Sequence, residues 1–294
     1  MSESTTRQSE TALLKRVIVR HPRDAYLDLA NIESQWERLN YRSPPNLERA
    51  MVEYEYFLKL LASEGAEVVS AGPGEGLCID SVYVRDASII CDRGAILCRM
   101  GKAARVAEPA NLGLQYERLG IPVLGSIQSP GLLEGGDFVW LGPRLAAVGE
   151  GYRTNQEGIA QLKVLLEDSV DELITVPLPH FRGPGDVFHL MSIISPLDND
   201  LALVYSPLMP VRFRNALKER GIDLIEVPAT EFNDIAGNVL AIAPRKVMMV
   251  AGNPETVRRL TDAGVEVLEF SGFEISTKGD GGPTCLSRPL ERKA

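Results

Sequence analysis

Hydrophobic residues recur at helical spacing in five segments of this chain, and a short break and an apolar run follow each segment. Apolar residues three and four positions apart predict amphipathic helices, and short runs of β-branched and aliphatic residues predict strands. Glycine follows four of the five periodic segments, as is common at the C-terminus of a helix. The expected helices span residues 46–64, 104–119, 155–167, 211–220 and 254–263. The expected strands span residues 67–69, 121–124, 173–176, 224–227 and 265–268.

Each of the last four helices is preceded by two apolar runs on either side of turn residues, which is the pattern of a β-hairpin. The four turns begin at residues 92, 142, 198 and 244, so the pattern repeats about every fifty residues. With Val17, Ile18 and Val19 as the start of a fifth, degenerate unit, we predict an α/β fold in the form of a fivefold α/β propeller. A doubly wound sheet is the alternative, and the four hairpins argue against it because its parallel strands are joined singly by helices.

No linker divides the repeats, so residues 15–294 are expected to form a single domain and the polar residues 1–14 to be frayed. A net charge of -9 and a pI of about 5.1 argue against a nucleic-acid partner and suit a small cationic substrate. No apolar run has the length of a membrane span and no secretory signal is visible, so the cytoplasm is the expected compartment. A homodimer is left open.

One cysteine, Cys285, stands behind Gly281, Gly282 and Pro283 and before a second proline, Pro289. These residues restrict the backbone around a single thiol, which favours a nucleophile, although a buried structural cysteine stays open from this stretch alone. The chain has four cysteines without Cys-x-x-Cys spacing and three histidines, so neither a disulfide framework nor a zinc site is expected.

Polar side chains stand at the same place in each repeat, just before the hairpin. In a ring these loops converge at one end of the axis, so we expect their side chains to meet. Cysteine and histidine together supply a nucleophile and a proton-transfer group, and carboxylates match the N–H groups of a planar guanidinium two at a time. A structural role stays open for each residue, and it is favoured for Asp80 and Asp137, which can fix their own loops. The side chains are Asp80, Asp86, Glu134, Asp137, His189, Asn233, Asp234, Asn238 and Cys285.

These residues and their order resemble the guanidine-group-modifying enzymes, the pentein superfamily, and most closely the dimethylarginine dimethylaminohydrolases. The resemblance extends from residue 17 to residue 290 and implies a fivefold α/β propeller. The motifs that carry it are D-S-V-Y-V-R-D at 80–86, E-G-G-D at 134–137, R-T-N at 153–155, H-L at 189–190 and G-G-P-T-C-L-S at 281–287.

The resemblance implies a role for each matching residue. Cys285 would be the nucleophile and His189 the general acid and base, while Glu134 and Asp86 would hold the guanidinium. Asp80 would lie nearby, Arg153 would grip the α-carboxylate of the substrate, and Arg105 is a second candidate for that grip.

The implied reaction is attack of the Cys285 thiolate on the guanidinium carbon, a covalent thiouronium, and its hydrolysis to a ureido product such as citrulline. No metal or organic cofactor takes part. Deiminases and amidinotransferases of the superfamily carry an acid two residues after the histidine, and dimethylarginine enzymes usually carry a lysine there, whereas this chain has Met191. Arg85 is also unusual, because it would neutralise Asp86 if the two side chains met.

We therefore predict a hydrolase of C–N bonds in linear amidines with a substrate of the dimethylarginine type. Arginine deimination, double hydrolysis to ornithine and amidino transfer stay open as alternatives. Residues 26–45 resemble in position a lid that selects the substrate.

Overall fold

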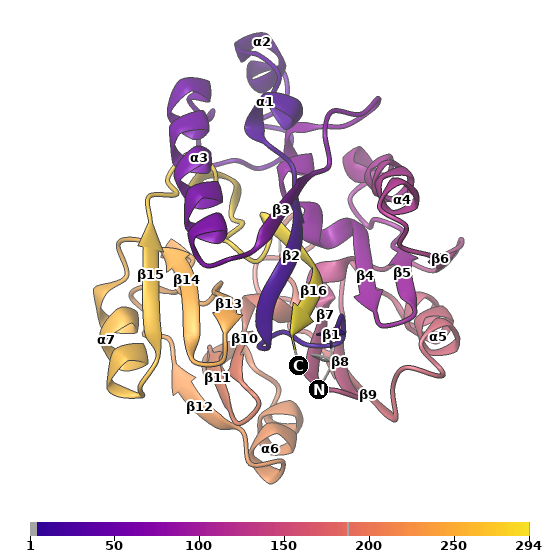
Figure 1. The fold of residues 1–294 in the computed structure, drawn as a ribbon, viewed down its shortest axis with the longest axis vertical. Helices are drawn as coiled ribbons and strands as arrows, with labels where there is room; N and C mark the ends of the chain where they lie inside the picture. The colour runs from indigo at the N-terminus through magenta and orange to yellow at the C-terminus, as the bar shows by residue number, and fades with distance from the viewer. Residues whose placement is uncertain (1–4, 187, 294) are drawn as a thin grey trace.

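The structure is a computed structural model that describes residues 5–186 and 188–293. Its strands form five small sheets around a common centre, as Figure 1 shows. In four of them a pair of antiparallel strands is followed by a third strand that runs parallel to the second. These sheets are β4 (Ser88–Cys91), β5 (Gly94–Leu97) and β6 (Val123–Ser126); β7 (Phe138–Gly142), β8 (Leu145–Glu150) and β9 (Glu172–Pro177); β10 (Ile194–Asp198), β11 (Leu201–Val204) and β12 (Asp223–Glu226); and β13 (Leu240–Ala243), β14 (Lys246–Val250) and β15 (Glu266–Phe270).

A helix connects the second and third strands of each unit and lies at the periphery of the ring (Figure 1). The side chain of Asn155 caps the helix that begins at Gln156 by accepting a hydrogen bond from the backbone N–H of Gly158. Gly65 follows the helix that ends at Ser63 and has a φ of 85°, a left-handed conformation that suits glycine. The helices are α3 (Leu47–Ser63), α4 (Glu108–Arg118), α5 (Gln156–Leu165), α6 (Val211–Glu219) and α7 (Pro254–Asp262). The hairpin, helix and strand units confirm the predicted fivefold α/β propeller.

The fifth sheet joins the two ends of the chain and is complete rather than degenerate. Strand β2 (Leu13–Val19) pairs antiparallel with β16 (Ser287–Lys293) and parallel with β3 (Glu67–Ser70). The C-terminal strand therefore supplies the hairpin partner that the sequence repeat lacks before the first helix. Both strands lie at the centre of the view in Figure 1.

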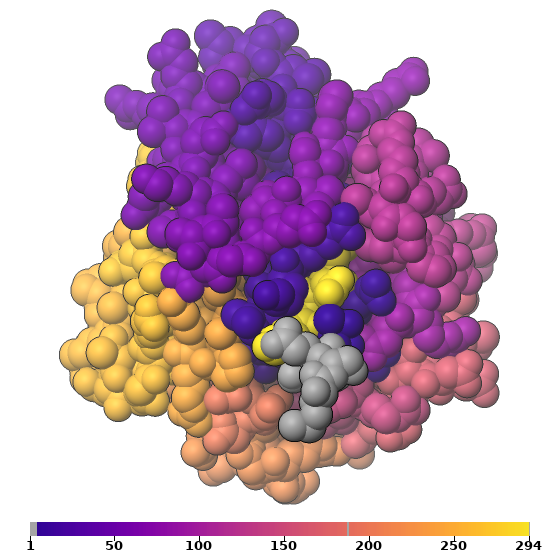
Figure 2. Space-filling view, in the orientation of Figure 1, coloured from indigo at the N-terminus to yellow at the C-terminus, as the bar shows by residue number. Residues whose placement is uncertain are grey.

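The start of the chain differs from the expectation of a frayed segment at residues 1–14. The described part of it is held against the ring, with β1 (Thr5–Thr6) paired to β16. The Gln8 side chain donates hydrogen bonds to the carbonyls of Pro143 and Ser169, at 2.8 and 2.9 Å, and accepts one from the backbone N–H of Asp92. Because these partners are backbone groups of the hairpin turns and loops, polar residues fix the segment without an apolar pattern. Figure 2 shows indigo N-terminal and yellow C-terminal residues together at the centre of this face.

Apolar side chains from neighbouring sheets and helices form the core. Val17 of β2, Phe57 of α3, Met248 of β14 and Phe270 of β15 belong to one buried cluster, with the two phenyl rings 5.2 Å apart. This packing between units holds the loops at the end of each sheet in fixed relation. Among the described helices, none combines the length and apolar character that a membrane span needs.

Candidate active site

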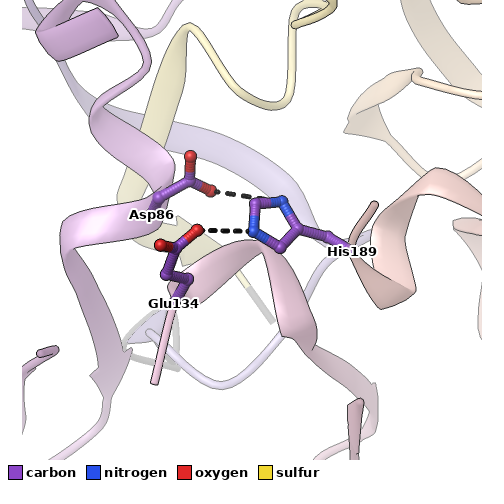
Figure 3. Close-up of side chains that lie close together, drawn as sticks. All are labelled: Asp86, Glu134 and His189. Carbon is purple, nitrogen blue, oxygen red and sulfur yellow. Dashed lines mark hydrogen bonds and ion pairs between the residues drawn. The ribbon is translucent and has the colours of Figure 1, made fainter. Parts of the chain in front are cut away.

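The loops that precede the hairpins bring together side chains from distant parts of the sequence. Asp86 lies in a 3₁₀ turn before β4, Glu134 stands just before β7, and His189 stands before the turn that leads to β10. Figure 3 shows the two carboxylates pointing toward the imidazole. All three side chains are buried. The ring thus joins three of the residues that the sequence singled out.

His189 lies between the two acids. Its Nε2 is 2.8 Å from Oε2 of Glu134, and its Nδ1 is 3.8 Å from Oδ1 of Asp86. Burial lowers the pKa of the imidazole, but Asp86, Asp137 and Glu134 outweigh it and raise the pKa to about 9. His189 is therefore a cation at neutral pH, with a proton available for transfer.

Glu134 is held by contacts on both of its oxygens. Oε1 accepts hydrogen bonds from the backbone N–H groups of Gly101 and Lys102, at 2.9 and 3.0 Å, and lies 3.4 Å from Nη1 of Arg153. Burial would raise the pKa of this carboxyl, but the hydrogen bond and charge of His189 hold it well below its usual range. The pair is ionised on both sides, which suits a proton donor oriented by a fixed anion.

Asp86 presents one engaged and one free oxygen. Its Oδ2 accepts a hydrogen bond from Nη1 of Arg105 at 2.5 Å. Its Oδ1 is buried and has no hydrogen-bond partner among the residues that the structure describes. A buried acceptor of this kind costs free energy unless a donor reaches it, so Oδ1 is a point where a ligand N–H group can bind.

Each of the three guanidinium nitrogens of Arg105 donates to a group of the protein itself. Besides Asp86, it contacts both oxygens of Glu108, at 2.7 and 2.8 Å, and the carbonyl of Tyr83 at 2.9 Å. The residue lies in a 3₁₀ turn, Ala103–Arg105, and not in the predicted helix from 104, because that helix begins at Glu108, just before Pro109. The geometry therefore favours Arg105 as a support for Asp86 over a grip on a substrate carboxylate.

Cys285 is partly buried beside Asp86. Its Sγ accepts a hydrogen bond from Nδ2 of Asn238 at 3.2 Å, and its carbonyl accepts one from the backbone N–H of Arg85 at 3.2 Å. Burial and the charge of Asp86 raise the pKa of the thiol to about 12, although Asn238, a backbone hydrogen bond with Gly282, and Arg85 act in the opposite direction. The thiol is thus neutral in the free protein.

Asp80 and Arg153 lie at the edge of this cluster. Oδ2 of Asp80 is 2.6 Å from Nζ of Lys102, whose side chain also donates to the carbonyl of Leu39. Arg153 is buried, and its contacts with Glu134 and with the carbonyl of Asp186 are long, at 3.3–3.5 Å. Sequence reasoning missed Lys102, since nothing in the sequence connects it with an acid 22 residues earlier.

Residues 26–45 contact loops from other parts of the ring. Nη2 of Arg42 lies 2.5 Å from Oδ1 of Asp280 and the same distance from the carbonyl of Asn233. The amide of Asn40 donates to the carbonyl of Gly185. The segment thus bridges three of the loops. A cavity of about 80 Å³ remains beneath it, lined by Arg42, Phe181, Arg182, Phe188, Phe232 and Asn238 among others.

The group of Asp86, Glu134 and His189 also has ligand atoms within 4.8 Å of one another, which is a spacing that a metal ion can use. One oxygen of each acid is already bonded to protein donors, and the imidazolium balances part of the negative charge. Protein donors thus already compensate part of the charge of these carboxylates.

The fold and the site together define a pentein, the class of guanidine-group-modifying enzymes. A family model of arginine deiminase matches residues 80–213 and 210–292, and the chain belongs to this family. N(G),N(G)-dimethylarginine dimethylaminohydrolase of Streptomyces coelicolor is 29% identical over 245 residues, which are 81% of this chain and 84% of that protein. An arginine deiminase of Mycobacterium tuberculosis is 30% identical over 247 residues, 72% of this chain and 60% of its own length.

Solved structures agree with this assignment. Dimethylarginine dimethylaminohydrolase of Pseudomonas aeruginosa, solved as a cysteine-to-serine mutant with citrulline, is 25% identical and superposes with a TM-score of 0.76. The superposition covers 95% of this chain and 99% of that one. Guanidino C–N chemistry is therefore the activity of the class to which this protein belongs.

Proposed function

We propose that the protein is a cysteine-dependent hydrolase that acts on the guanidino carbon of an arginine derivative of the dimethylarginine type. The observation that carries the proposal is Oδ1 of Asp86, which has no hydrogen-bond partner among the described residues, lies 3.8 Å from Nδ1 of His189, and belongs to an acid whose charge acts on the thiol of Cys285. A guanidinium that donates an N–H group to this oxygen places its central carbon among a nucleophile, a proton donor and an anion.

Substrate binding would also activate the thiol. Because the charge of Asp86 helps to raise the pKa of Cys285, a bound cation that neutralises Asp86 lowers that pKa. The imidazolium of His189 favours the thiolate in the same way. The nucleophile then forms where its electrophile is already bound, and the free enzyme does not expose a reactive thiolate.

The reaction proceeds in two halves. The proton of the Cys285 thiol leaves to solvent, because His189 already carries one. The thiolate then adds to the central carbon, His189 gives its proton to the departing nitrogen, and the C–N bond breaks to release dimethylamine. Water then adds to the thiouronium carbon and gives a proton to His189, and the C–S bond breaks to release citrulline. Glu134 keeps its charge throughout and stabilises the imidazolium.

The remaining residues would orient the substrate. Arg153 has only long contacts with Glu134 and Asp186, and it would bind the α-carboxylate of an amino acid substrate. Asp80, which is held by Lys102, adds negative potential next to the cation site. Arg105 fixes Asp86 so that its free oxygen points toward the ligand.

Deimination of unsubstituted arginine is a second candidate, because the mycobacterial relative of 30% identity is named an arginine deiminase. Met191 favours a substrate with an alkylated guanidinium instead. Its side chain is buried and its sulfur accepts a hydrogen bond from Nη2 of Arg85, so this position offers no carboxylate where deiminases carry an acid. A thioether cannot bind the N–H groups of a bare guanidinium as a carboxylate does, but it tolerates methyl groups.

One set of incubations separates the candidates. The protein is given dimethylarginine, arginine, or arginine plus glycine, and dimethylamine, ammonia, citrulline, ornithine and guanidinoacetate are measured. We expect dimethylamine and citrulline in equal amounts from dimethylarginine. Cys285→Ser is expected to abolish this turnover, and Cys91→Ala, a buried cysteine on β4, is the matched control that keeps it. Guanidinoacetate as the main product, or turnover by Cys285→Ser, would refute the proposal.

A further inference from the structure

Arg85 precedes the acid that is proposed to bind the substrate, yet its side chain does not pair with that acid. Nη2 of Arg85 lies 2.5 Å from Oε1 of Glu10 and 3.2 Å from Sδ of Met191. Both partners of this ion pair are buried, Arg85 to 99% and Glu10 to 93%. The expected neutralisation of Asp86 by its neighbour is therefore prevented by a residue at the start of the chain.

The backbone of Arg85 belongs to the site as well. Its N–H donates to the carbonyl of Cys285, and its carbonyl accepts a hydrogen bond from Arg288. The side chain of Arg85 thus starts from backbone next to Asp86 in the sequence and extends to Glu10.

Glu10 meets more positive charge than one arginine supplies. Arg288 and Arg292 are also buried here; burial and the charge of Arg85 lower the pKa of each guanidinium to about 10, while Glu10 acts to raise it. The side chains of Arg288 and Arg292 have buried N–H groups without a partner among the described residues. Arg85 thus pairs with Glu10, and the charge of Glu10 also acts on Arg288 and Arg292. Removal of that charge leaves buried positive charge next to a site that is proposed to bind a cation.

The segment around Glu10 is built to keep it in place. Gln8 and Thr6 form hydrogen bonds with Asp92 in the turn between β4 and β5. Gln8 also forms hydrogen bonds with the unit of β7, β8 and β9. These contacts lie on the face of the ring shown in Figure 2, where the N-terminal residues occupy the centre. Glu10 therefore reaches the cluster from the face where the chain ends meet.

We propose that Glu10 is a positioning residue of the active site, a role that rests on the proposed function: it holds Arg85 away from Asp86 so that Asp86 can bind the guanidinium of the substrate. The N-terminal segment is then a part of the catalytic apparatus that none of the matching motifs includes. Without Glu10, Arg85 competes with the substrate for Asp86, either by contact or through its field.

The first test is a double-mutant cycle on the full-length protein with dimethylarginine. Glu10→Gln is expected to raise KM about tenfold, with a smaller effect on kcat. The reason is that Arg85, no longer paired with a carboxylate, repels the substrate cation and competes with it for Asp86. Arg85→Gln removes the competitor, so its KM is expected at or below that of the wild type. The double variant is expected to return KM to within about threefold of the wild type. A double variant with a KM as high as that of Glu10→Gln, or a raised KM for Arg85→Gln alone, would overturn the proposal.

Gln8→Ala is the matched control, because it loosens the same segment without touching Arg85. We expect it to lower Tm and to leave KM within twofold of the wild type. A KM for Gln8→Ala that rises as much as that of Glu10→Gln would mean that the segment acts only through the stability of the ring, and the proposal would fail.

A measurement without substrate distinguishes the proposed role of Glu10 from the proposed function of the protein. The rate at which iodoacetamide alkylates Cys285 follows the thiolate fraction, and this thiol faces Asp86, Arg85 and Tyr83. Because Arg85 lowers the pKa of the thiol, Glu10→Gln is expected to move the alkylation profile to lower pH and Arg85→Gln to higher pH. These shifts without any turnover by the wild type would refute the proposed function alone. Turnover with an unchanged alkylation profile in both variants would refute the role of Glu10 alone.

Discussion

Replacement of Glu134 by glutamine has a consequence that follows from the hydrogen bonds of its two oxygens. Oε1 accepts from the backbone N–H groups of Gly101 and Lys102, so the amide oxygen of the new side chain takes that position. The NH₂ group then faces Nε2 of His189, which is 2.8 Å from Oε2 in the wild type. A donor there requires a lone pair on Nε2, so Glu134→Gln favours the neutral imidazole.

The magnitude follows from the pKa of His189. It is about 9 in the wild type, against 6.5 for a free histidine, and the charge and hydrogen bond of Glu134 contribute to that rise. A charge-assisted hydrogen bond of this kind contributes about 1.5–3 kcal/mol, and the lost attraction between the charges adds to it. We expect the pKa of His189 to fall by about 2 units, which corresponds to about 2.7 kcal/mol. Asp86 and Asp137 remain and limit the fall.

The sign of the pH dependence is fixed by the raised pKa. Protonation of His189 stabilises the wild-type fold fully below pH 6.5, and this contribution is lost as the pH rises through about 9. The difference in free energy of unfolding between wild type and Glu134→Gln should therefore shrink by about 2.7 kcal/mol between pH 5.5 and pH 9.5. The imidazole pKa is measured directly by NMR, which is simple in a chain of three histidines. Glu172→Gln, at a half-exposed acid that pairs with Arg220, is the control. An unchanged pKa of His189 in Glu134→Gln would refute the reasoning.

Three further predictions test other parts of the site. Gly136→Ala places a methyl group 2.5 Å from the site imidazole, so activity should fall by at least about a hundredfold, whereas Gly142→Ala, whose new Cβ has an ordinary contact at 3.6 Å, should keep it. Equal activities in steady-state assays would contradict this. Arg42→Ala breaks the contact of the lid with Asp280 and should raise KM about threefold to fivefold with Tm nearly unchanged; a lower kcat at constant KM would contradict it. Saturation with a non-reactive guanidinium such as guanidine should move the alkylation profile of Cys285 to lower pH, and a shift to higher pH would contradict activation by the substrate cation.

The ring could be predicted from the sequence because each unit repeats the same local signals. Glycine at 65 and 264, the apolar hairpins and the helical periodicity act over a few residues, and the structure keeps all five helices within a few residues of the expected ranges. Helix α4 begins at Glu108, four residues after the predicted start at 104, because the stretch before Pro109 forms a 3₁₀ turn. Local signals do not carry the pairing of the chain ends, so the partner of β2 was missing from the prediction.

The sequence predicted which residues form the candidate site better than it predicted the contacts between them. Asp86, Glu134 and His189 meet as the repeat positions suggested. The pairing of Lys102 with Asp80 and of Arg85 with Glu10 was not visible, because each joins segments with no common pattern. Polar contacts across a ring depend on the direction of side chains, and a repeat pattern does not specify that direction.

The pairing of β2 with β16 also bears on when the protein acquires its site during synthesis. Cys285 lies two residues before the strand that closes the ring, so a nascent chain has its acids and its imidazole long before it has its sulfur. Chains that lack β16 then carry an open ring in which β2 pairs with β3 alone, and they lack the proposed nucleophile. The proposed reactivity toward small electrophilic cations would appear only after the strand that follows Cys285 has docked against β2.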